Sequence, residues 1–261
     1  MTDMNDPREI RAQIRAGKLT RTTAGLAPDY VQANLAVLPK EQAYDFLLFC
    51  QRNPQPCPLL EVTDVGSPEP KMTAPGADLR TDIAKYRIYK NGEQVDEVTD
   101  ATPYWRDDLV AFLLGCSFTF EQAMVQSGVH LWHLENEKSV AMWRTNIQCK
   151  PAGMFHGPMV VSMRPIKAAE LSKAVTASAR YPGAHGAPVH IGAPEAIGIE
   201  DINKPHYGDA QQFDRGDIPV FWACGVTPQA VALASKPPFM ITHSPGSMFI
   251  TDVPNSSLAA F

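Results

Sequence analysis

Apolar residues recur at helical spacing through the first part of the chain. Residues 7–19 (PREIRAQIRAGKL) open with a proline and contain Gly17 near their end, the usual start and stop signals of a helix. The segments 29–39 (DYVQANLAVLP) and 40–53 (KEQAYDFLLFCQRN) predict two more helices. Further along, residues 105–128 predict a long helix with a break near Gly115. This half of the chain is therefore expected to be rich in helix.

One strand pair interrupts these predicted helices. Residues 84–98 (AKYRIYKNGEQVDEV) predict a β-hairpin, because Asn91-Gly92 at its centre suits the positive φ angles of a tight turn.

The pattern changes to strands alternating with helices after about residue 139. Short apolar runs bounded by glycine or proline predict strands at 139–149, 158–166, 187–192 and 218–225, helices at 167–180 and 227–235, and a strand pair at 239–253. This alternation predicts an α/β fold with helices layered on a largely buried sheet. We place a boundary near residue 150, between a helix-rich half with one hairpin (1–150) and an α/β half (151–261), packed as one compact unit.

Composition narrows the class of protein. The chain has 261 residues, 44% of them hydrophobic, and a formal charge of −5, so it offers no basic face for nucleic acid. Its five cysteines are scattered and form no C-x-x-C pair, which disfavours a disulfide scaffold or zinc ribbon and suits a reducing cytoplasm. The opening residues MTDMNDPREI are polar and acidic, unlike a secretory signal. The longest apolar run, at 109–116, is too short to cross a membrane.

Two histidines lie close together in the glycine-rich segment 180–192 (RYPGAHGAPVHIG). His185 and His190 suit three interpretations: a turn shaped by glycine, a catalytic or substrate-binding loop, and a metal site. A metal would need further ligands, such as His206 or Asp209, and no metal-binding motif supplies their spacing. Arg180, just upstream, would add a cation to a binding loop.

The segment around Cys224 is a second candidate, because it joins a predicted strand to a predicted helix. Thr227 and Pro228 form a good helix start, so the backbone of Cys224, Gly225 and Thr227 could bind an anion. We expect Cys224 to be a packed, reduced thiol rather than a nucleophile. In the next strand pair, His243 suits a site as well as it suits the core.

Arginines and aspartates supply the remaining candidates. Arg144 and Asn146 are two residues apart on a predicted strand and share a face, which suits a carboxylate clamp or a surface ion pair. Arg164, expected at a strand end, has the same two interpretations. Asp108 suits either a helix-start carboxylate or a general base.

The motifs together resemble a known family. The sequence has no G-x-G-x-x-G, Walker loop or G-x-S-x-G, so a nucleotide or flavin cofactor is not indicated. The ordered segments RNPQPCPLLEV, WRDDLVAFLLGCSFTFE, MWRTNIQC, GPMVVSMRP, RYPGAHGAPVHIG, PVFWACGVTPQ and FMITHSPGSMFITD resemble the "putative hydro-lyase" family, which is similar to the D-glutamate cyclases. The resemblance runs from about residue 8 to residue 253. It departs at PHYGD (205–209), where an acidic residue is expected in place of His206.

The resemblance implies a lyase, and by similarity the dehydration of D-glutamate to 5-oxo-D-proline. It also implies an α/β architecture of two interleaved subdomains, but it assigns no catalytic residues. For that chemistry we assign the carboxylate clamp to Arg144 or Arg180, the base to His185 or an aspartate, and the oxyanion donors to His190 and the amides of 224–227. These steps need neither metal nor organic cofactor.

Two other functions fit the same residues. A non-catalytic protein that binds a small carboxylic or amino acid would keep the arginine clamp and the amide nest without an acid–base pair. A metal-dependent hydratase of another hydroxy acid would add a metal. All three predict a small-molecule partner, with neither nucleic acid nor membrane, and leave a homo-oligomer open.

Overall fold

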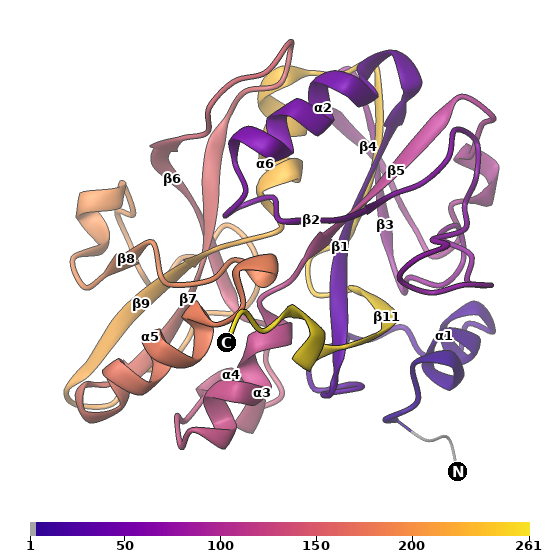
Figure 1. Ribbon diagram of the computed structural model, residues 1–261. Helices are drawn as coiled ribbons and strands as arrows, with labels where there is room; N and C mark the ends of the chain where they lie inside the picture. Colours follow the sequence, from indigo (N-terminus) through magenta and orange to yellow (C-terminus); the bar gives the residue numbers. More distant parts are fainter. Residues whose placement is uncertain (1–3) are drawn as a thin grey trace.

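The protein is an α/β structure built on two antiparallel sheets (Figure 1). This computed structural model describes residues 4–261, so the first three residues of the polar opening lie outside it. The first sheet has the order β2–β5–β1–β10–β3–β4, with β11 also beside β1. Its strands are β1 (Tyr30–Pro39), β2 (Leu59–Val62), β3 (Tyr86–Lys90), β4 (Glu93–Val98), β5 (Leu109–Gly115), β10 (Phe239–His243) and β11 (Phe249–Pro254). The second sheet has the order β6–β7–β9–β8, with strands β6 (Ala141–Gln148), β7 (Pro158–Lys167), β8 (His190–Ile191) and β9 (Asp217–Ala223).

Two predicted helices of the N-terminal half are wrong. Residues 30–39 form the central strand β1, and residues 109–115 form β5, which pairs with β1 along its length. Nine of the ten residues of β1 and all seven of β5 are buried. A strand covered on both faces shows a continuous apolar run rather than an alternation, and periodicity cannot distinguish such a run from a buried helix. Only the end of the predicted 105–128 helix exists, as α3 (Phe118–Gln126).

The other predicted elements are confirmed with small changes. The hairpin is β3–β4, and both Asn91 and Gly92 take positive φ at its turn. The predicted strands of the second half appear as β6, β7, β8 and β9. The final two strands do not form a simple hairpin. Instead both lie along the same edge of β1, with β10 beside one end and β11 beside the other.

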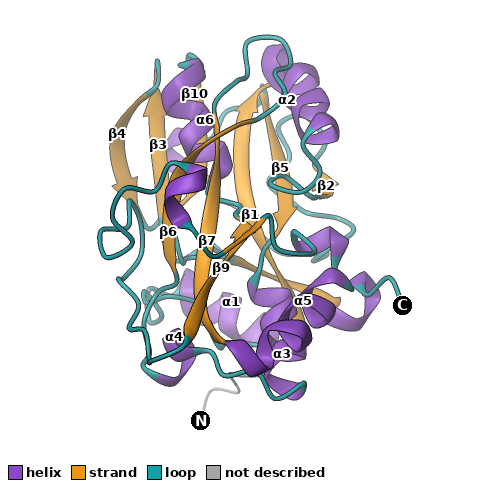
Figure 2. Cartoon of the chain, turned by 90° about the vertical axis from the view of Figure 1, so that its left-hand side faces the viewer, coloured by secondary structure: helices purple, strands orange, loops and turns teal. Residues whose placement is uncertain are grey.

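The helices gather at two ends of the molecule. Figure 2 shows α1, α3, α4 and α5 at one end and α2 and α6 at the other. Their bounds are α1 (Pro7–Arg15), α2 (Lys40–Arg52), α3 (Phe118–Gln126), α4 (Trp132–Glu135), α5 (Leu171–Ala179) and α6 (Thr227–Ser235). Helix α6 contacts β10 of the first sheet and β7 of the second, so it lies between the sheets. Within residues 4–261 no helix has the length and apolar character needed to span a bilayer.

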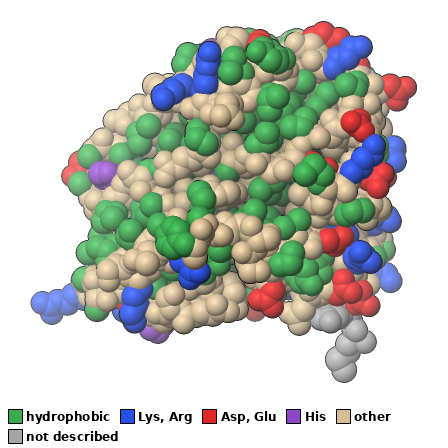
Figure 3. Space-filling model, in the orientation of Figure 1, with side chains coloured by type: hydrophobic (Ala, Val, Ile, Leu, Met, Phe, Trp, Pro, Cys, Tyr) green, Lys and Arg blue, Asp and Glu red, His purple; other side chains and the backbone are tan. Residues whose placement is uncertain are grey.

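The core continues on both faces of the first sheet. On one face Leu35, Val37 and Ile241 pack with Phe249. On the other face Phe46 of α2 packs edge-on against neighbouring aromatic rings. Charged side chains of both signs are interspersed on the surface in Figure 3, mostly along its right-hand edge. That face therefore carries no field of a single sign.

Candidate active site

A small cavity lies where the two sheets meet. It has a volume of about 20 Å³, which holds about one water molecule. The first sheet and its loops contribute Asn34, His243, Gly246 and Met248, and the ends of β5 and β9 contribute the residues that start two helices. The complete lining is Asn34, Cys116, Ser117, Phe118, Ser139, Val140, Met142, Cys224, Val226, His243, Gly246 and Met248.

Two helices begin at this cavity. Helix α3 follows β5 through Cys116 and Ser117, and α6 follows β9 through Cys224 and Gly225. The two helices belong to opposite ends of the molecule, yet the residues at both N-termini line the same space. The helix dipole makes such an end favourable for an anion, while the first N–H groups of both helices already bond Cys116, Ser117, Cys224 and Val226 within the chain. Two of them at one cavity favour a carboxylate ligand.

The two thiols have matching surroundings. Cys116 and Cys224 are both buried and free. Burial raises the pKa of the Cys116 thiol well above its usual value and that of Cys224 to about 11, so both are protonated at neutral pH. A backbone hydrogen bond to each thiol, from Phe118 to Cys116 and from Val226 to Cys224, lowers the pKa and so partly opposes the effect of burial.

His243 lines the cavity, and its Nε2 has no hydrogen-bond partner among residues 4–261. Its ring is 1% exposed, and its Nδ1 lies 3.1 Å from the backbone nitrogen of Leu35 and 3.4 Å from the Leu35 carbonyl oxygen. The shorter contact makes Nδ1 the acceptor, so the neutral ring carries its proton on Nε2, which has no hydrogen-bond partner. Burial lowers the pKa of His243 to about 4, helped by the charge of Arg87. At neutral pH the ring is therefore an uncharged N–H donor.

A buried charged network supports one wall of the cavity. Arg164 is fully buried and donates from Nε to Glu121 at 3.0 Å and from Nη2 to the Ser117 hydroxyl at 2.9 Å. His133 Nε2 lies 3.0 Å from the same carboxylate. Burial alone would raise the pKa of Glu121, but the charges and hydrogen bonds of His133 and Arg164 lower it to about 2. Arg164 is thus placed inside β7, rather than at a strand end, and it positions Ser117.

Sequence reasoning missed Asn34, Glu121 and Arg87. Asn34 sits in an apolar strand, where its amide donates to the Gly115 carbonyl at 2.7 Å. Arg87 lies on β3 and bonds Glu97 at 3.1 Å and Gln229 at 3.5 Å. A polar residue inside an otherwise apolar run was the available signal for Asn34. The sequence held no signal for Arg87, because only the pairing of β3 with β10 brings it near His243.

The predicted 224–227 segment is at the site, but not in the form expected. Val226, not Thr227, occupies the cap position of α6. The Thr227 hydroxyl donates to the Cys224 carbonyl at 2.7 Å and accepts from the Val160 amide at 3.1 Å, so it ties α6 to β7. Gly225 is in close contact with Asn34: a Cβ atom on Gly225 would lie 1.9 Å from Asn34 Nδ2.

The structure does not bring the predicted histidine pair together. His185 is buried at positive φ, and its Nδ1 donates to the Gln55 carbonyl at 2.7 Å. Burial lowers its pKa to about 4. His190 packs against Phe221 at the sheet edge, with Nε2 2.9 Å from the Ala193 carbonyl. Arg180 instead donates to the Phe261 carbonyl at 2.5 Å. None of these three side chains lines the inter-sheet cavity.

Arg144 and Asn146 share a face as predicted, but it borders a different hollow. Both are exposed on β6 and line an open cleft of about 670 Å³ with Lys204 and His206. The Arg144 backbone N–H donates to His206 Nδ1 at 3.3 Å. The 180–192 loop does not line this cleft.

Asp108 lies at neither hollow. The predicted helix that would have placed it at a positive end is absent, and it stands just before β5 instead. Its carboxylate accepts from Arg106 Nε at 2.9 Å on the surface. That pair lowers the pKa of Asp108, so the group is a weak base.

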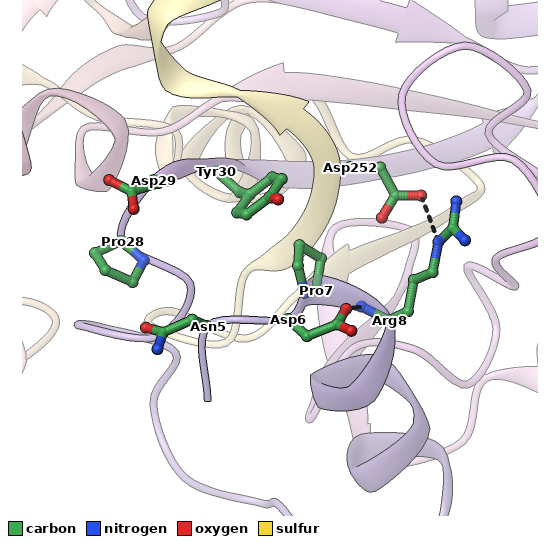
Figure 4. A pocket seen from close by; sticks show the side chains of 8 residues that line it. All are labelled: Asn5, Asp6, Pro7, Arg8, Pro28, Asp29, Tyr30 and Asp252. Carbon is green, nitrogen blue, oxygen red and sulfur yellow. Dashed lines mark hydrogen bonds and ion pairs between the residues drawn. The ribbon is translucent and has the colours of Figure 1, made fainter. Parts of the chain in front are cut away.

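A further hollow at the N-terminus has a structural explanation (Figure 4). Asp6 accepts from the Arg8 amide at 2.8 Å and caps α1. The Arg8 side chain reaches Asp252 of β11, with 3.7 Å between Nε and Oδ2. These contacts fix α1 against the first sheet.

Comparison with known proteins gives the family. The model of the D-glutamate cyclase family matches residues 110–252. The chain belongs to the D-glutamate cyclase family. The matched span contains every lining residue of the cavity except Asn34.

Relatives named "Putative hydro-lyase" match nearly the whole chain. One from Bacillus licheniformis is 60% identical over 95% of this chain and 94% of its own. Another, from Thermoanaerobacter sp., is 62% identical over 97% of this chain and 96% of its own. A third, from Bacillus subtilis, is 56% identical over 97% of this chain and 98% of its own. A similarity of this extent supports a lyase of the same family.

Proposed function

We propose that this member of the D-glutamate cyclase family is a carbon–oxygen lyase that dehydrates D-glutamate to 5-oxo-D-proline in the inter-sheet cavity. One observation carries the choice of site. The N-termini of α3 and α6 meet at the same cavity as the unpartnered Nε2–H of His243. The site thus combines two anion-binding helix ends with a neutral donor, and the family match covers it.

The chemistry uses these groups in turn. One substrate carboxylate binds at the helix N-termini, which holds the α-amine near the γ-carboxyl carbon. The ammonium group transfers one proton to the γ-carboxylate, which frees the nitrogen to form a bond to that carbon, and His243 donates a hydrogen bond to the oxygen that gains negative charge. A C–O bond then breaks, and the protonated oxygen leaves as water with a second proton from the nitrogen, which keeps the third. The proposed steps use protein groups alone.

The substrate requires the cavity to enlarge. A cavity of about 20 Å³ holds about one water molecule, not a dicarboxylate. Ser139, Val140 and Gly246 line it from the loops before β6 and after β10. The Ser139 amide donates to Asp209 at 2.8 Å. We propose that glutamate displaces these two loops, and that residues 139 and 209 separate or move together.

The test is a product assay with both enantiomers. The protein is incubated with D-glutamate or L-glutamate, and 5-oxoproline is measured by chiral chromatography and mass spectrometry. The proposal expects 5-oxo-D-proline from D-glutamate, with equal rates before and after treatment with a chelator. If D-glutamate raises Tm but no product forms, the non-catalytic binding function is favoured instead. Activity lost with a chelator and restored by a metal ion would favour the metal-dependent hydratase.

A further inference from the structure

The cavity contains three titratable side chains, and two of them are thiols. Of its twelve lining residues only Cys116, Cys224 and His243 have titratable side chains, and none of the twelve is a carboxylate. The carboxylate of Glu121, next to Ser117 in the Arg164 network, is held by Arg164 and His133. Proton transfer to a bound ligand therefore falls to the thiols and the histidine.

The thiols reach the cavity from the two sheets. Cys116 follows β5 of the first sheet, and Cys224 follows β9 of the second. Each stands at the start of a nine-residue helix. They are close enough for their charges to interact, since Cys224 contributes to the raised pKa of Cys116. We infer that a ligand in the enlarged cavity contacts one thiol from each sheet.

We propose that Cys116 and Cys224 form a two-thiol acid–base pair that removes and replaces the α-hydrogen of the bound amino acid, so that the protein also racemises glutamate. The proposal shares with the proposed function the binding of an α-amino acid in this cavity, but it does not depend on cyclisation. The unpartnered Nε2 of His243 is the independent sign that this cavity receives a polar ligand.

In the opened cavity one thiol first loses its proton to solvent, and the exchange that follows needs no other reactant. One cysteine, as thiolate, takes the α-proton, and the C–H electron pair remains on the α-carbon. The other cysteine, as thiol, donates its proton to the opposite face of that carbon. The product is the mirror-image amino acid, and the two sulfurs have exchanged protonation states. Nothing is oxidised or reduced.

The surroundings assist both halves of this step. The α-carboxylate, which takes up the negative charge of the carbanion, lies at the N-termini of α3 and α6. In the closed cavity both thiols are protonated. An arriving α-ammonium group places a positive charge beside them and favours formation of a thiolate. Deprotonation is thus coupled to the presence of the substrate.

The experiment measures α-hydrogen exchange separately from cyclisation. The protein is incubated in D2O with D-glutamate or L-glutamate, and loss of the α-proton is followed by NMR, inversion by chiral chromatography and 5-oxoproline by mass spectrometry. We expect the wild-type protein to exchange and invert both enantiomers. Cys116→Ser and Cys224→Ser should each lower inversion at least ~100-fold, because a serine hydroxyl is a far weaker acid than a thiol. Each variant should keep exchange for one enantiomer, and the two variants should keep opposite ones.

A matched control is Cys149→Ser, a buried free thiol that does not line the cavity, which should behave as wild type. Unfolding temperatures identify any variant that fails to fold, and Cys→Ala at the same position then replaces it. Cyclisation without exchange in the wild-type protein overturns the two-thiol proposal and leaves the proposed function standing. Exchange without cyclisation supports the thiols and overturns the proposed function. The two-thiol proposal is also overturned if both variants keep exchange for the same enantiomer, or if neither exchange nor cyclisation is seen.

Discussion

His243 is the residue on which the proposed dehydration most depends. Its Nδ1 accepts from the Leu35 amide, which fixes the ring, and burial keeps it neutral. We expect His243→Asn to lower kcat for 5-oxoproline formation about 10²- to 10³-fold, the cost of losing one oxyanion donor. The shorter amide can still accept from Leu35, so KM and the fold should change little. Steady-state kinetics with D-glutamate measure this.

The matched control for that variant is His190→Asn. His190 bonds a carbonyl at the edge of the second sheet and does not line the cavity. It should retain nearly full activity. An unaltered kcat in His243→Asn, or an equal loss in His190→Asn, would remove His243 from the proposed role.

Residue types identified part of this site in advance, but not their partners. His243, Cys224 and Gly225 stood out because histidine, cysteine and glycine follow strand ends, where loops carry function. Arg164 stood out as a carboxylate clamp, yet its charge is engaged by Glu121, 43 residues away in sequence. A long-range ion pair leaves no local pattern. His185 likewise has a partner distant in sequence, the carbonyl of Gln55, 130 residues away.

At the scale of elements, a close approach between β1 and the start of α6 shapes the cavity. Gly225→Ala would place a Cβ atom 1.9 Å from Asn34 Nδ2. Asn34 cannot easily move, because it bonds the Gly115 carbonyl at 2.7 Å. We expect this variant to lose about 1–3 kcal/mol of stability, as overpacked cores do, together with most activity. Denaturant unfolding and the product assay measure the two effects.

Two further variants test whether the loss comes from the contact between Gly225 and Asn34 or from placing alanine at any glycine position. Gly183→Ala should be tolerated, because its Cβ would meet only Leu258 methyl groups at 3.6 and 3.7 Å. Removing the opposing side chain with Asn34→Ala in the Gly225→Ala background should recover stability. If the double variant is as unstable as the single one, the contact between Gly225 and Asn34 does not set the spacing.

In the N-terminal half, the elements that could be predicted from sequence are those with one exposed face or a distinctive turn. Helix α1 and the β3–β4 hairpin carry proline, glycine or Asn-Gly at their ends, and both were predicted correctly. Strands β1 and β5 carry no such signal within their buried runs. Their identity depends on pairing with each other and with β10, which is a property of the whole sheet.

At the scale of the whole molecule, β1 connects distant parts of the chain. It pairs with β5 on one side and with β10 and β11 on the other, so segments from both ends of the sequence complete the first sheet. The second sheet is formed by residues 141–223 and meets the first at the cavity. The active site we propose therefore requires the packing of both sheets, and its stability should follow that of the fold.

Stability should consequently decline in mild acid. His185 and His243 are buried and uncharged, and burial lowers the pKa of each to about 4, against 6.5 for an exposed ring. Below pH 6.5 the unfolded chain binds protons that the folded protein does not, so the free energy of unfolding falls as pH drops from 6.5 to 4. Each ring contributes up to about 1.4 kcal/mol per pH unit in that window. Glu121, whose pKa is lowered to about 2, adds a further loss below pH 4.5.

Urea unfolding at pH 7.0, 6.0 and 5.0 measures the slope of the free energy of unfolding against pH. His185→Gln and His243→Gln should each reduce this slope, since glutamine does not titrate. A wild-type free energy of unfolding that stays constant from pH 7.0 to 5.0 would show that these rings are hydrated in the folded protein, which would remove the basis for an uncharged His243 donor.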